Sequence, residues 1–433
     1  MLQLYYTRGE SSIKTLIKNG YIVNFDGKFH GDILIEDGKI INIGKNIDDN
    51  YDKCIDAEGN YVFPGFIDAH THLGRHDELG YSKETSDFYT ETKAAYIGGT
   101  TTIFDFAYTK KGESLIAAVE NKEKFYKGTD NCKYELHVVI TEVREDIYHQ
   151  LKELKRAGIK GVKVYTTHNI KLSNEEILKV MHYCAKLGMV ILVHCEDDAL
   201  IQYCKNKHNY NLRRPKKSEV NAVFTIINYA LMTKCKTYFC NISCRKSLEL
   251  ISKAKLKGAK LYLETCPHYM LLNSGQYLRN SLKERTKFLV NPPLRDEKDN
   301  KALINGALGG AVDLISSDHY AYVYEEHKSK YFHDDDNAAK GIPGIQLRPS
   351  LIYTLLVEEY KLPVEEYVRL LSYSPSRIFN LFDRGYIRIG ASADLVIWNK
   401  EKFKVSLDDL IEGTDYSPYE GVELTGRAKY VFK

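Results

Sequence analysis

The chain has 433 residues, of which 43% are hydrophobic and 27% are charged. This length suits one large domain and a smaller one, and the composition is that of an ordinary globular protein. The 61 basic and 58 acidic residues give a net charge of +3. This balance excludes the strongly basic surface of nucleic-acid-binding proteins, and we expect no nucleic-acid partner.

Membrane and secretion signals are not expected either. No apolar run approaches the ~20 residues of a membrane span, and the first residues, MLQLYYTRGESSIK, do not resemble a secretory signal. Nine cysteines without framework spacing indicate reduced thiols and predict a cytoplasmic protein. Cys240 and Cys244 are spaced CxxxC, which is weak evidence for a zinc knuckle.

The N-terminal part of the chain is rich in short β-like runs. Residues 14–64 alternate such runs with Gly and Asp turns, and the same texture returns in GYIRIGASADLVIWN (385–399) and in the final LTGRAKYVFK. Short strands at this spacing indicate a small β-sandwich. We therefore predict a discontinuous β-sandwich domain from residues 1–64 and 382–433.

Between these ends, strand-like and helix-like patterns alternate. Apolar runs such as TTTIFDF, GVKVYTT, MVILVHC, KTYFCNI and VDLISSD are separated by helical stretches such as NEEILKVMHYCAKLG. Alternation at this length indicates an α/β fold with a parallel sheet, and about eight units favour a (β/α)8 barrel. We predict this TIM-like barrel over residues 65–381.

The polar residues that end the apolar runs are the candidates for a site, because active sites of such barrels lie at the C-terminal ends of the strands. They are His70, His72, Lys163, His194, Asn241 and Asp318.

His70 and His72 form an HxH pair after FPGFID. On a strand, residues i and i+2 project from one face, so both imidazoles can reach one cation. Imidazole suits zinc and other first-row metals. By itself an HxH pair is more often two unrelated histidines, but its position at a strand end favours a ligand pair.

The other strand-end residues each have a simpler explanation when taken alone. His194 could be a core histidine, Asp318 a helix N-cap and Lys163 an ion-paired lysine. Together with histidines, however, Asp318 is the carboxylate expected to complete a metal site and could also transfer a proton. Lys163 can become a ligand only if carbon dioxide converts it to a carbamate.

At this point the chain resembles the cyclic amidohydrolases, specifically the hydantoinase/dihydropyrimidinase branch. The resemblance runs from about Thr15 to Lys429 and rests on several motifs in family order: PGFIDAHTHL, GIKGVKVYTTH, VILVHCEDDALI, ETCPHYMLL, VNPPLR, AVDLISSDH, GIPGIQ and SPSRIFNLFDRGYIRIGASADLVIW.

The resemblance implies a (β/α)8 barrel with a binuclear metal site, most often zinc. It implies that His70, His72 and Asp318 hold one ion and that carboxylated Lys163 bridges to a second. His194 and a further histidine would hold the second ion. A hydroxide between the ions would attack the cyclic amide carbon, with Asp318 as the proton shuttle to the leaving nitrogen.

The further histidine falls at Asn241, which is the main departure from the family pattern. Three outcomes are open: the Asn241 oxygen binds a looser second ion, the site uses one metal, or the protein is a non-catalytic scaffold that resembles the collapsin response mediator proteins. Because a bridging carbamate is useful only with metal, the presence of Lys163 favours a working site. We expect Cys240 to point away from Asn241, towards the surrounding helices.

The residues expected to read the substrate also depart from the family. His168 stands where hydantoinases usually have a tyrosine, and a histidine can still donate to a developing oxyanion. Asn291 replaces a usual serine, His319 is followed by Tyr320 in place of a usual Cys-Pro or Ala-Pro pair, and the loop before GIPGIQ is shortened. Arg75 lies one position later than the substrate arginine of dihydroorotases. We expect substrate contacts from His168, Asn291 and His319.

The sequence thus predicts a metal-dependent hydrolase of a cyclic ureide or imide, such as a hydantoin or dihydropyrimidine. The alternatives are the scaffold already named and a dihydroorotase- or allantoinase-type activity. We expect the protein to bind a small cyclic amide and to assemble with further copies of the chain in a homodimer or homotetramer. We expect no membrane partner.

Overall fold

The computed structural model describes residues 13–74 and 87–433. Its strands are β1 (Thr15–Asn24), β2 (Gly27–Glu36), β3 (Lys39–Gly44), β4 (Lys53–Asp56), β5 (Tyr61–Pro64), β6 (Phe66–Asp68), β7 (Thr100–Tyr108), β8 (Lys133–Val139), β9 (Gly161–Tyr165), β10 (Val190–His194), β11 (Lys236–Phe239), β12 (Leu261–Thr265), β13 (Leu314–Ile315), β14 (Leu395–Lys404) and β15 (Glu423–Phe432).

The α-helices lie mostly between the strands of the central part. They are α1 (Phe88–Ile97), α2 (Leu115–Tyr126), α3 (Ile147–Arg156), α4 (Asn174–Leu187), α5 (Asp198–Cys204), α6 (Tyr210–Arg213), α7 (Lys216–Thr233), α8 (Arg245–Leu256), α9 (Pro267–Leu271), α10 (Leu282–Thr286), α11 (Glu297–Leu308), α12 (Tyr324–His327), α13 (Arg348–Ile352), α14 (Val364–Val368) and α15 (Ser374–Ile378). Short helices η1 (Ser274–Leu278), η2 (Ser329–Tyr331), η3 (Tyr353–Glu359), η4 (Arg369–Tyr373) and η5 (Leu407–Asp409) complete the set.

Strands β6 to β13 form one eight-stranded parallel sheet in chain order, which curls into a nearly closed barrel. Its inward positions are filled by apolar and aromatic side chains from several strands, among them Phe104, Val139, Leu192, Tyr238 and Leu314. The outer faces of the strands pack against the helices in a larger second core. This arrangement confirms the predicted TIM-like barrel.

The two edges of the barrel meet at β6 and β13, where the strand order ends on each side. The guanidinium of Arg348, fully buried, lies across this seam and donates hydrogen bonds to the carbonyl oxygens of Ile67 (3.1 Å) and Ile315 (2.9 Å). Beyond the strand ends, the amide of Asp318 donates to the carbonyl oxygen of His70 (3.0 Å). Polar contacts therefore hold the seam closed next to the candidate ligands.

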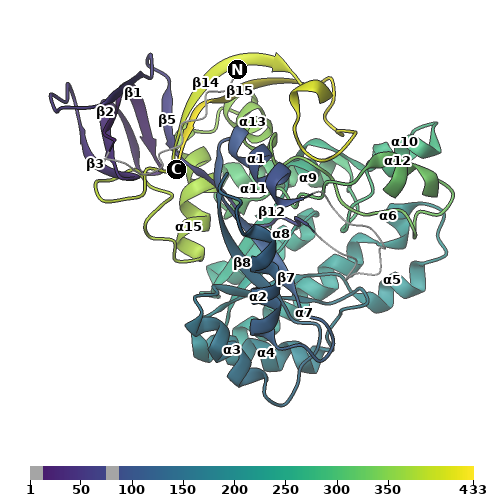
Figure 1. Ribbon diagram of the computed structural model, residues 1–433. Coiled ribbons are helices and arrows are strands. Elements are labelled where there is room, and N and C mark those ends of the chain that lie inside the picture. Colours follow the sequence, from purple (N-terminus) through teal and green to yellow (C-terminus); the bar gives the residue numbers. More distant parts are fainter. Residues whose placement is uncertain (1–12, 75–86) are drawn as a thin grey trace.

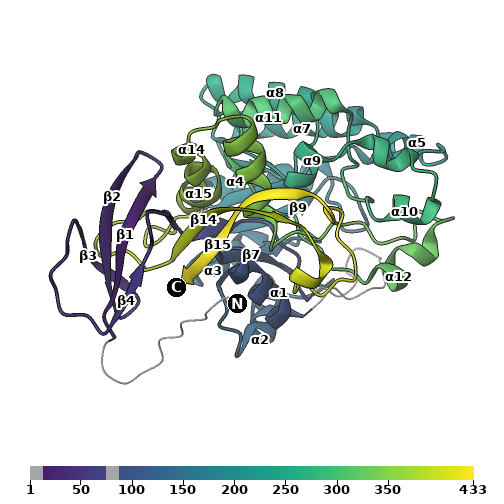
Figure 2. The same cartoon turned by 90° about the horizontal axis from the view of Figure 1, so that it is seen from above.

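A second sheet has seven strands, in the order β15-β14-β5-β1-β2-β3 with β4 paired to β1. It joins the N-terminal strands to the C-terminal hairpin through the antiparallel pair of β5 and β14. Strands β1–β4 project beside the barrel, whereas β14 and β15 arch over it (Figures 1 and 2). Strands from both ends of the chain thus share one sheet, as the sequence predicts.

Among the helices that the structure describes, none combines the length and the apolar character needed to cross a bilayer.

Candidate metal centre

Two histidines and an aspartate converge across the barrel seam. His70 and His72 follow β6, and Asp318 follows β13. The Oδ1 atom of Asp318 lies 3.2 Å from Nε2 of His70 and 3.2 Å from Nε2 of His72. All three side chains are buried, and their ligand atoms form a compact group that could hold a metal ion.

The orientation of His70 is fixed by Glu264, at the end of β12. The Nδ1 atom of His70 lies 2.8 Å from Oε1 of Glu264. A carboxylate accepts, so Nδ1 donates and the Nε2 atom of a neutral His70 presents its lone pair to Asp318. A histidine lone pair and a carboxylate oxygen 3.2 Å apart need a cation between them or a proton on the ring.

Asp318 is held in its charged form. Burial alone would raise the pKa of Asp318, but His70, His72 and the Asn241 amide stabilise the carboxylate, and its pKa lies well below the usual value. Asp318 also adopts a left-handed backbone with φ of 49°. His168 and Asn241 share this feature, with φ of 73° and 41°. Three of the predicted site residues therefore lie in a sparsely populated region that Asn, Asp and His adopt more readily than other non-glycine residues.

Lys163 enters the same cavity from the middle of β9. Its side chain is fully buried between the rings of Phe106 and Tyr165, 5.3 and 5.2 Å from its Nζ atom. Within the described ranges Nζ has no hydrogen-bond partner. Burial lowers the pKa of Lys163, but Cys240, Glu264 and Asp318 outweigh it and the net shift is upwards. A buried amine without a hydrogen bond fits a residue that acquires its partners by modification or ligand binding.

Asn241 follows β11 and reaches the cavity because of its left-handed backbone. Its Nδ2 atom donates to Oδ2 of Asp318 (2.9 Å), and its main-chain amide donates to Oε1 of Glu264 (2.8 Å). Its Oδ1 atom, also buried, has no hydrogen-bond partner among the described residues. The structure therefore offers one amide oxygen at the position where the resemblance implies an imidazole.

The expected direction of Cys240 is wrong. Cys240 packs in the barrel interior with Tyr238 and Leu192, and it influences the pKa of Lys163. Along β11, residues 238 and 240 point inwards, and simple alternation would send residue 241 outwards. The left-handed turn after the strand breaks the alternation and brings the side chain of Asn241 into the site as well. Burial raises the pKa of the Cys240 thiol to about 12, so it stays protonated.

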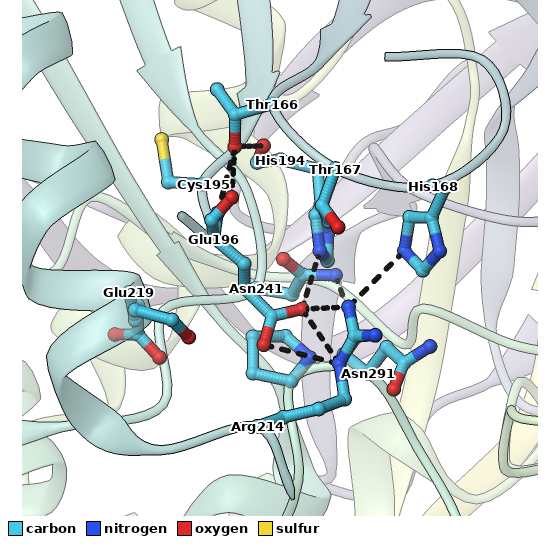
Figure 3. A network of polar contacts seen from close by, with 12 residues as sticks. Thr166, Thr167, His168, His194, Cys195, Glu196, Arg214, Glu219, Asn241 and Asn291 are labelled. Carbon is cyan, nitrogen blue, oxygen red and sulfur yellow. Dashed lines mark hydrogen bonds and ion pairs between the residues drawn. The ribbon is translucent and has the colours of Figure 1, made fainter. Parts of the chain in front are cut away.

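His194 ends β10 and is supported by an ion-paired network behind it (Figure 3). Its Nε2 atom lies 3.0 Å from Oε2 of Glu196, and Glu196 forms a buried ion pair with Arg214. Burial would raise the pKa of Glu196, but Arg214 and His194 hold it far below its usual value. Burial lowers the pKa of His194, so the ring is neutral near pH 7 and its Nδ1 lone pair is available.

The same network reaches His168, the predicted oxyanion contact. Nη2 of Arg214 lies 3.5 Å from Nε2 of His168. His168, His194 and Glu196 could form a metal group by distance. In Figure 3, however, the guanidinium of Arg214 lies between Glu196 and His168. The fixed positive charge of Arg214 at this position opposes a metal ion held jointly by His168, His194 and Glu196.

The cavity over these residues is lined by the full predicted ligand set, by His168 and Asn291, and by Tyr165, Val290, Tyr320, Lys340 and Gly341. Its volume is about 30 Å³, room for roughly one water molecule. The side chain of Asn291 accepts a hydrogen bond from Tyr210. The ring of Tyr320 stacks on His72, with centroids 4.1 Å apart. Larger cavities of about 410–430 Å³ lie elsewhere, so the chemistry of the lining, and not its size, marks this site.

His319 does not line this cavity. Its Nε2 atom lies 2.7 Å from Glu91, and its Nδ1 accepts from the amides of Gly344 and Ile345. The ring is completely buried, so the expected substrate contact finds no support and His319 holds loop segments together instead. Arg75 lies outside the described residues.

Sequence reasoning missed four residues of this region: Glu264, Arg214, His268 and Lys340. Glu264 carries a detectable signal, since it is an acidic residue at the end of an apolar strand run. His268 lies near Asp318 and Cys266; burial lowers its pKa to about 4. Arg214 and Lys340 come from loops, and only the folded chain brings them to the cavity.

Comparison with known proteins agrees with the geometry. The amidohydrolase family matches residues 61–433. The chain is 31% identical to a D-hydantoinase of Ralstonia pickettii, over 96% of this chain and 93% of the relative, and 32% identical to a D-hydantoinase of Geobacillus stearothermophilus, over 95% and 90%.

Solved structures are also similar to this chain over nearly its whole length. A D-hydantoinase crystal structure superposes with a TM-score of 0.92 at 31% identity, covering 96% of this chain and 93% of that chain. A dihydropyrimidinase from Brevibacillus agri gives 0.93 at 27% identity, covering 97% and 95%. The resemblance seen in the motifs is thus confirmed, and the chain belongs to the amidohydrolase family, in its hydantoinase and dihydropyrimidinase branch of cyclic amidohydrolases.

Proposed function

We propose that this protein hydrolyses the amide C–N bond of a cyclic ureide or imide, such as a hydantoin or a dihydropyrimidine, with divalent metal held at the candidate centre. The observation that carries the proposal is the convergence of His70, His72 and Asp318. Oδ1 of Asp318 lies 3.2 Å from Nε2 of each histidine, while Glu264 directs the His70 lone pair towards Asp318. Such a group of acceptors is a ready cation site.

A second ion would be held by His194, Asn241 and a carboxylated Lys163, and we infer that both ions are zinc. Two buried polar atoms without hydrogen bonds, Nζ of Lys163 and Oδ1 of Asn241, support this assignment. Carboxylation consumes the neutral amine, and the raised pKa of Lys163 disfavours that form. We therefore expect the carbamate to form only together with cation binding.

Bound divalent metal supplies a water of lowered pKa and polarises the amide carbonyl. The chain provides the proton transfers. Asp318 is a carboxylate near pH 7, so it can accept a proton from an attacking water and pass it to the ring nitrogen, which leaves poorly unless protonated. His168 lines the same cavity as Asp318 and can donate a hydrogen bond to a developing oxyanion.

The non-catalytic scaffold is the less favoured reading. The other five expected ligands converge on one cavity together with Asn241, and a scaffold has no need of a buried lysine beside histidines. A dihydroorotase- or allantoinase-type activity would open the same dihydropyrimidine or hydantoin ring with a carboxylate or a ureido substituent, so ring opening of dihydroorotate and allantoin would distinguish it.

We further propose a cytoplasmic homodimer or homotetramer. None of the nine cysteines, which all lie in the described ranges, forms a disulfide, as expected in a reducing compartment. Helix α7 exposes Phe224, Leu231 and Met232, and α8 exposes Leu256, with 56, 44, 72 and 89% of each residue accessible. Apolar groups on two adjoining helices favour contact with another subunit, and light scattering in solution would measure the assembly.

We also propose that residues 1–64 with 382–433 form one domain and residues 65–381 the other. The assignment of β1–β5 with β14 and β15 to one sheet and of β6–β13 to the barrel supports these limits.

The decisive experiment measures metal content and ring opening together. Purified protein loaded with zinc is analysed for metal per chain and for opening of hydantoin and dihydrouracil, with Asp318→Asn as the matched control. We expect bound metal and turnover in the wild type. The variant should bind less metal and show severely reduced turnover, because Asp318 is both a proposed ligand of the first ion and the proposed proton acceptor. A wild type that binds no transition metal and keeps Lys163 unmodified would overturn the proposal.

A further inference from the structure

One buried carboxylate lies between the ligands of the two proposed ions. Glu264 is part of β12, and its side chain is completely buried. The proposed ligands of the first ion follow β6 and β13, and those of the second ion come from β9, β10 and β11. In the sheet, β12 stands between β11 and β13. Glu264 therefore lies where the two ligand groups meet around the barrel, and it serves as a ligand in neither.

A single oxygen of this carboxylate contacts both ligand groups. Oε1 of Glu264 lies 2.8 Å from Nδ1 of His70, and it accepts a hydrogen bond from the main-chain amide of Asn241, also over 2.8 Å. The other oxygen, Oε2, accepts from the hydroxyl of Tyr238, whose ring packs in the barrel interior. Glu264 thus contacts a ligand of the first ion at its side chain and a ligand of the second ion at its backbone.

The two contacts control different properties of these ligands. When Nδ1 of His70 donates to the carboxylate, the lone pair of Nε2 is left for a cation and the ring becomes a stronger base. At Asn241 the contact holds the left-handed turn, with φ of 41°, that brings the amide side chain into the cavity. A non-glycine residue keeps such a backbone only where its surroundings hold it. Loss of the carboxylate would therefore release the ring of His70 and the turn at Asn241 together.

We propose that Glu264 is a positioning residue for both metal positions and that its carboxylate links them into one unit. The inference rests on the proposed function, because it takes His70 as a ligand of the first ion and Asn241 as a ligand of the second. Glu196 differs from Glu264, since it supports His194 and hence the second ion alone. A change at Glu264 accordingly weakens both ions, whereas a change at Glu196 weakens one.

The test measures zinc bound per chain at a series of buffered free zinc concentrations, with bicarbonate present as the source of carbon dioxide for Lys163. Two ions of unequal affinity give a binding curve with two steps, and Glu196→Gln identifies the step of the second ion.

Two variants of Glu264 separate the hydrogen bonds from the charge. Glu264→Leu removes both hydrogen bonds to Oε1. Glu264→Gln removes the charge but can keep a carbonyl oxygen on the Oε1 side, because the hydroxyl of Tyr238 can turn to accept from the new amide group. The amide of Ile242 donates to the main-chain carbonyl oxygen of Glu264 (3.0 Å), a contact that both variants retain. Leu263→Ala, on the same strand with its side chain in the outer core, is the matched control for loss of stability.

Glu264→Leu should shift both steps of the zinc curve, each by roughly 10- to 100-fold in affinity, as expected when a hydrogen-bond partner of a metal ligand is removed. Glu264→Gln should lie between this variant and the wild type at both steps. Glu196→Gln should shift only the step of the second ion, and Leu263→Ala should shift neither. Because Glu264 acts through the ions, high free zinc should restore most of the hydantoin opening that Glu264→Gln loses at low free zinc.

A Glu264→Leu variant that shifts only one step would overturn the inference. Shifts in Leu263→Ala as large as those in Glu264→Leu would also overturn it, because general loss of stability would then explain both. If Glu264→Leu does not fold, Glu264→Gln decides by the same criterion, and an unchanged step refutes the shared role. In each of these cases a wild type that binds two ions and opens hydantoin leaves the proposed function intact. A wild type that binds one ion or none contradicts both the inference and the two-ion assignment.

Discussion

Replacement of Asn241 by histidine tests how the second metal is held. Asn241 is 4% exposed and donates to Asp318 over 2.9 Å. Its φ of 41° is left-handed, a region that histidine also adopts with less strain than most residues. The backbone can therefore stay in place while the amide is exchanged for the imidazole usual in the family.

The magnitude follows from the contacts that are lost and gained. Loss of a hydrogen bond to a charged carboxylate costs about 1.5–3 kcal/mol, and a larger ring in a packed site costs about 1–3 kcal/mol more. The metal-free variant should therefore be about 3–5 kcal/mol less stable than the wild type. An added zinc site would recover about 2.7 kcal/mol at a free zinc concentration 100 times its Kd.

The assay is urea unfolding with and without zinc, combined with metal analysis of the protein. Asn241→His should bind more zinc per chain and should be stabilised by zinc more than the wild type. Asn241→Leu loses the same hydrogen bond without offering a ligand, so zinc should stabilise it no more than the wild type. If Asn241→His binds no additional zinc and responds to zinc as the wild type does, Asn241 does not stand at a metal position and the reasoning is refuted.

Three further substitutions test other parts of the site. Glu196→Gln leaves Arg214 buried without its carboxylate, which should lower the free energy of unfolding by about 3–5 kcal/mol. The same change removes the carboxylate that holds His194, so metal binding should weaken about 10- to 100-fold. Unchanged zinc affinity by titration would contradict this supporting role. Tyr320→Ala removes the ring stacked on His72, so kcat/KM for hydantoins with bulky 5-substituents should rise relative to hydantoin itself, at a cost in stability of about 3–5 kcal/mol; a constant substrate ratio would count against Tyr320 as the limiting wall. The pKa of Lys340 is about 7 when folded and 10.5 ordinarily, so the unfolded chain binds more protons between these values and stability should rise with pH across this range. The Lys340→Met variant should lack this contribution. Between about pH 7 and about pH 9, its free energy of unfolding, measured with denaturant, should rise by ~2 kcal/mol less than that of the wild type. An equal rise would contradict the low pKa of Lys340.

The fold could be predicted because its signals are local and repeated. Each barrel strand is a short apolar run followed by a helical pattern, so the alternation identifies a parallel barrel without knowledge of any contact. The same rule locates the site, since strand ends of a parallel barrel meet at one face. His70, Lys163 and Asp318 were found in this way, and all of them line one cavity.

Other parts of the site depend on geometry that a sequence pattern does not carry. Period-two alternation holds as far as Cys240 and fails at Asn241, because the strand ends at Phe239 and the turn at Asn241 is left-handed. His319 follows a strand-end ligand, yet its ring turns away to Glu91. Lys340 comes from a loop segment far along the chain, and only tertiary packing places it at the cavity.

The position of the metal centre at the barrel seam couples metal binding to closure of the barrel. Within residues 13–74 and 87–433 no ladder joins β6 to β13, and the edges meet through Arg348 and a few backbone contacts beyond the strands. His70 and His72 extend from one edge and Asp318 from the other, so one ion bound by all three would link the first and last strands of the barrel. Occupancy and barrel closure then become a single coupled equilibrium. When the metal is removed, amide hydrogen exchange should increase at β6 and β13 before it increases at β9 or β10, which are each paired on both sides.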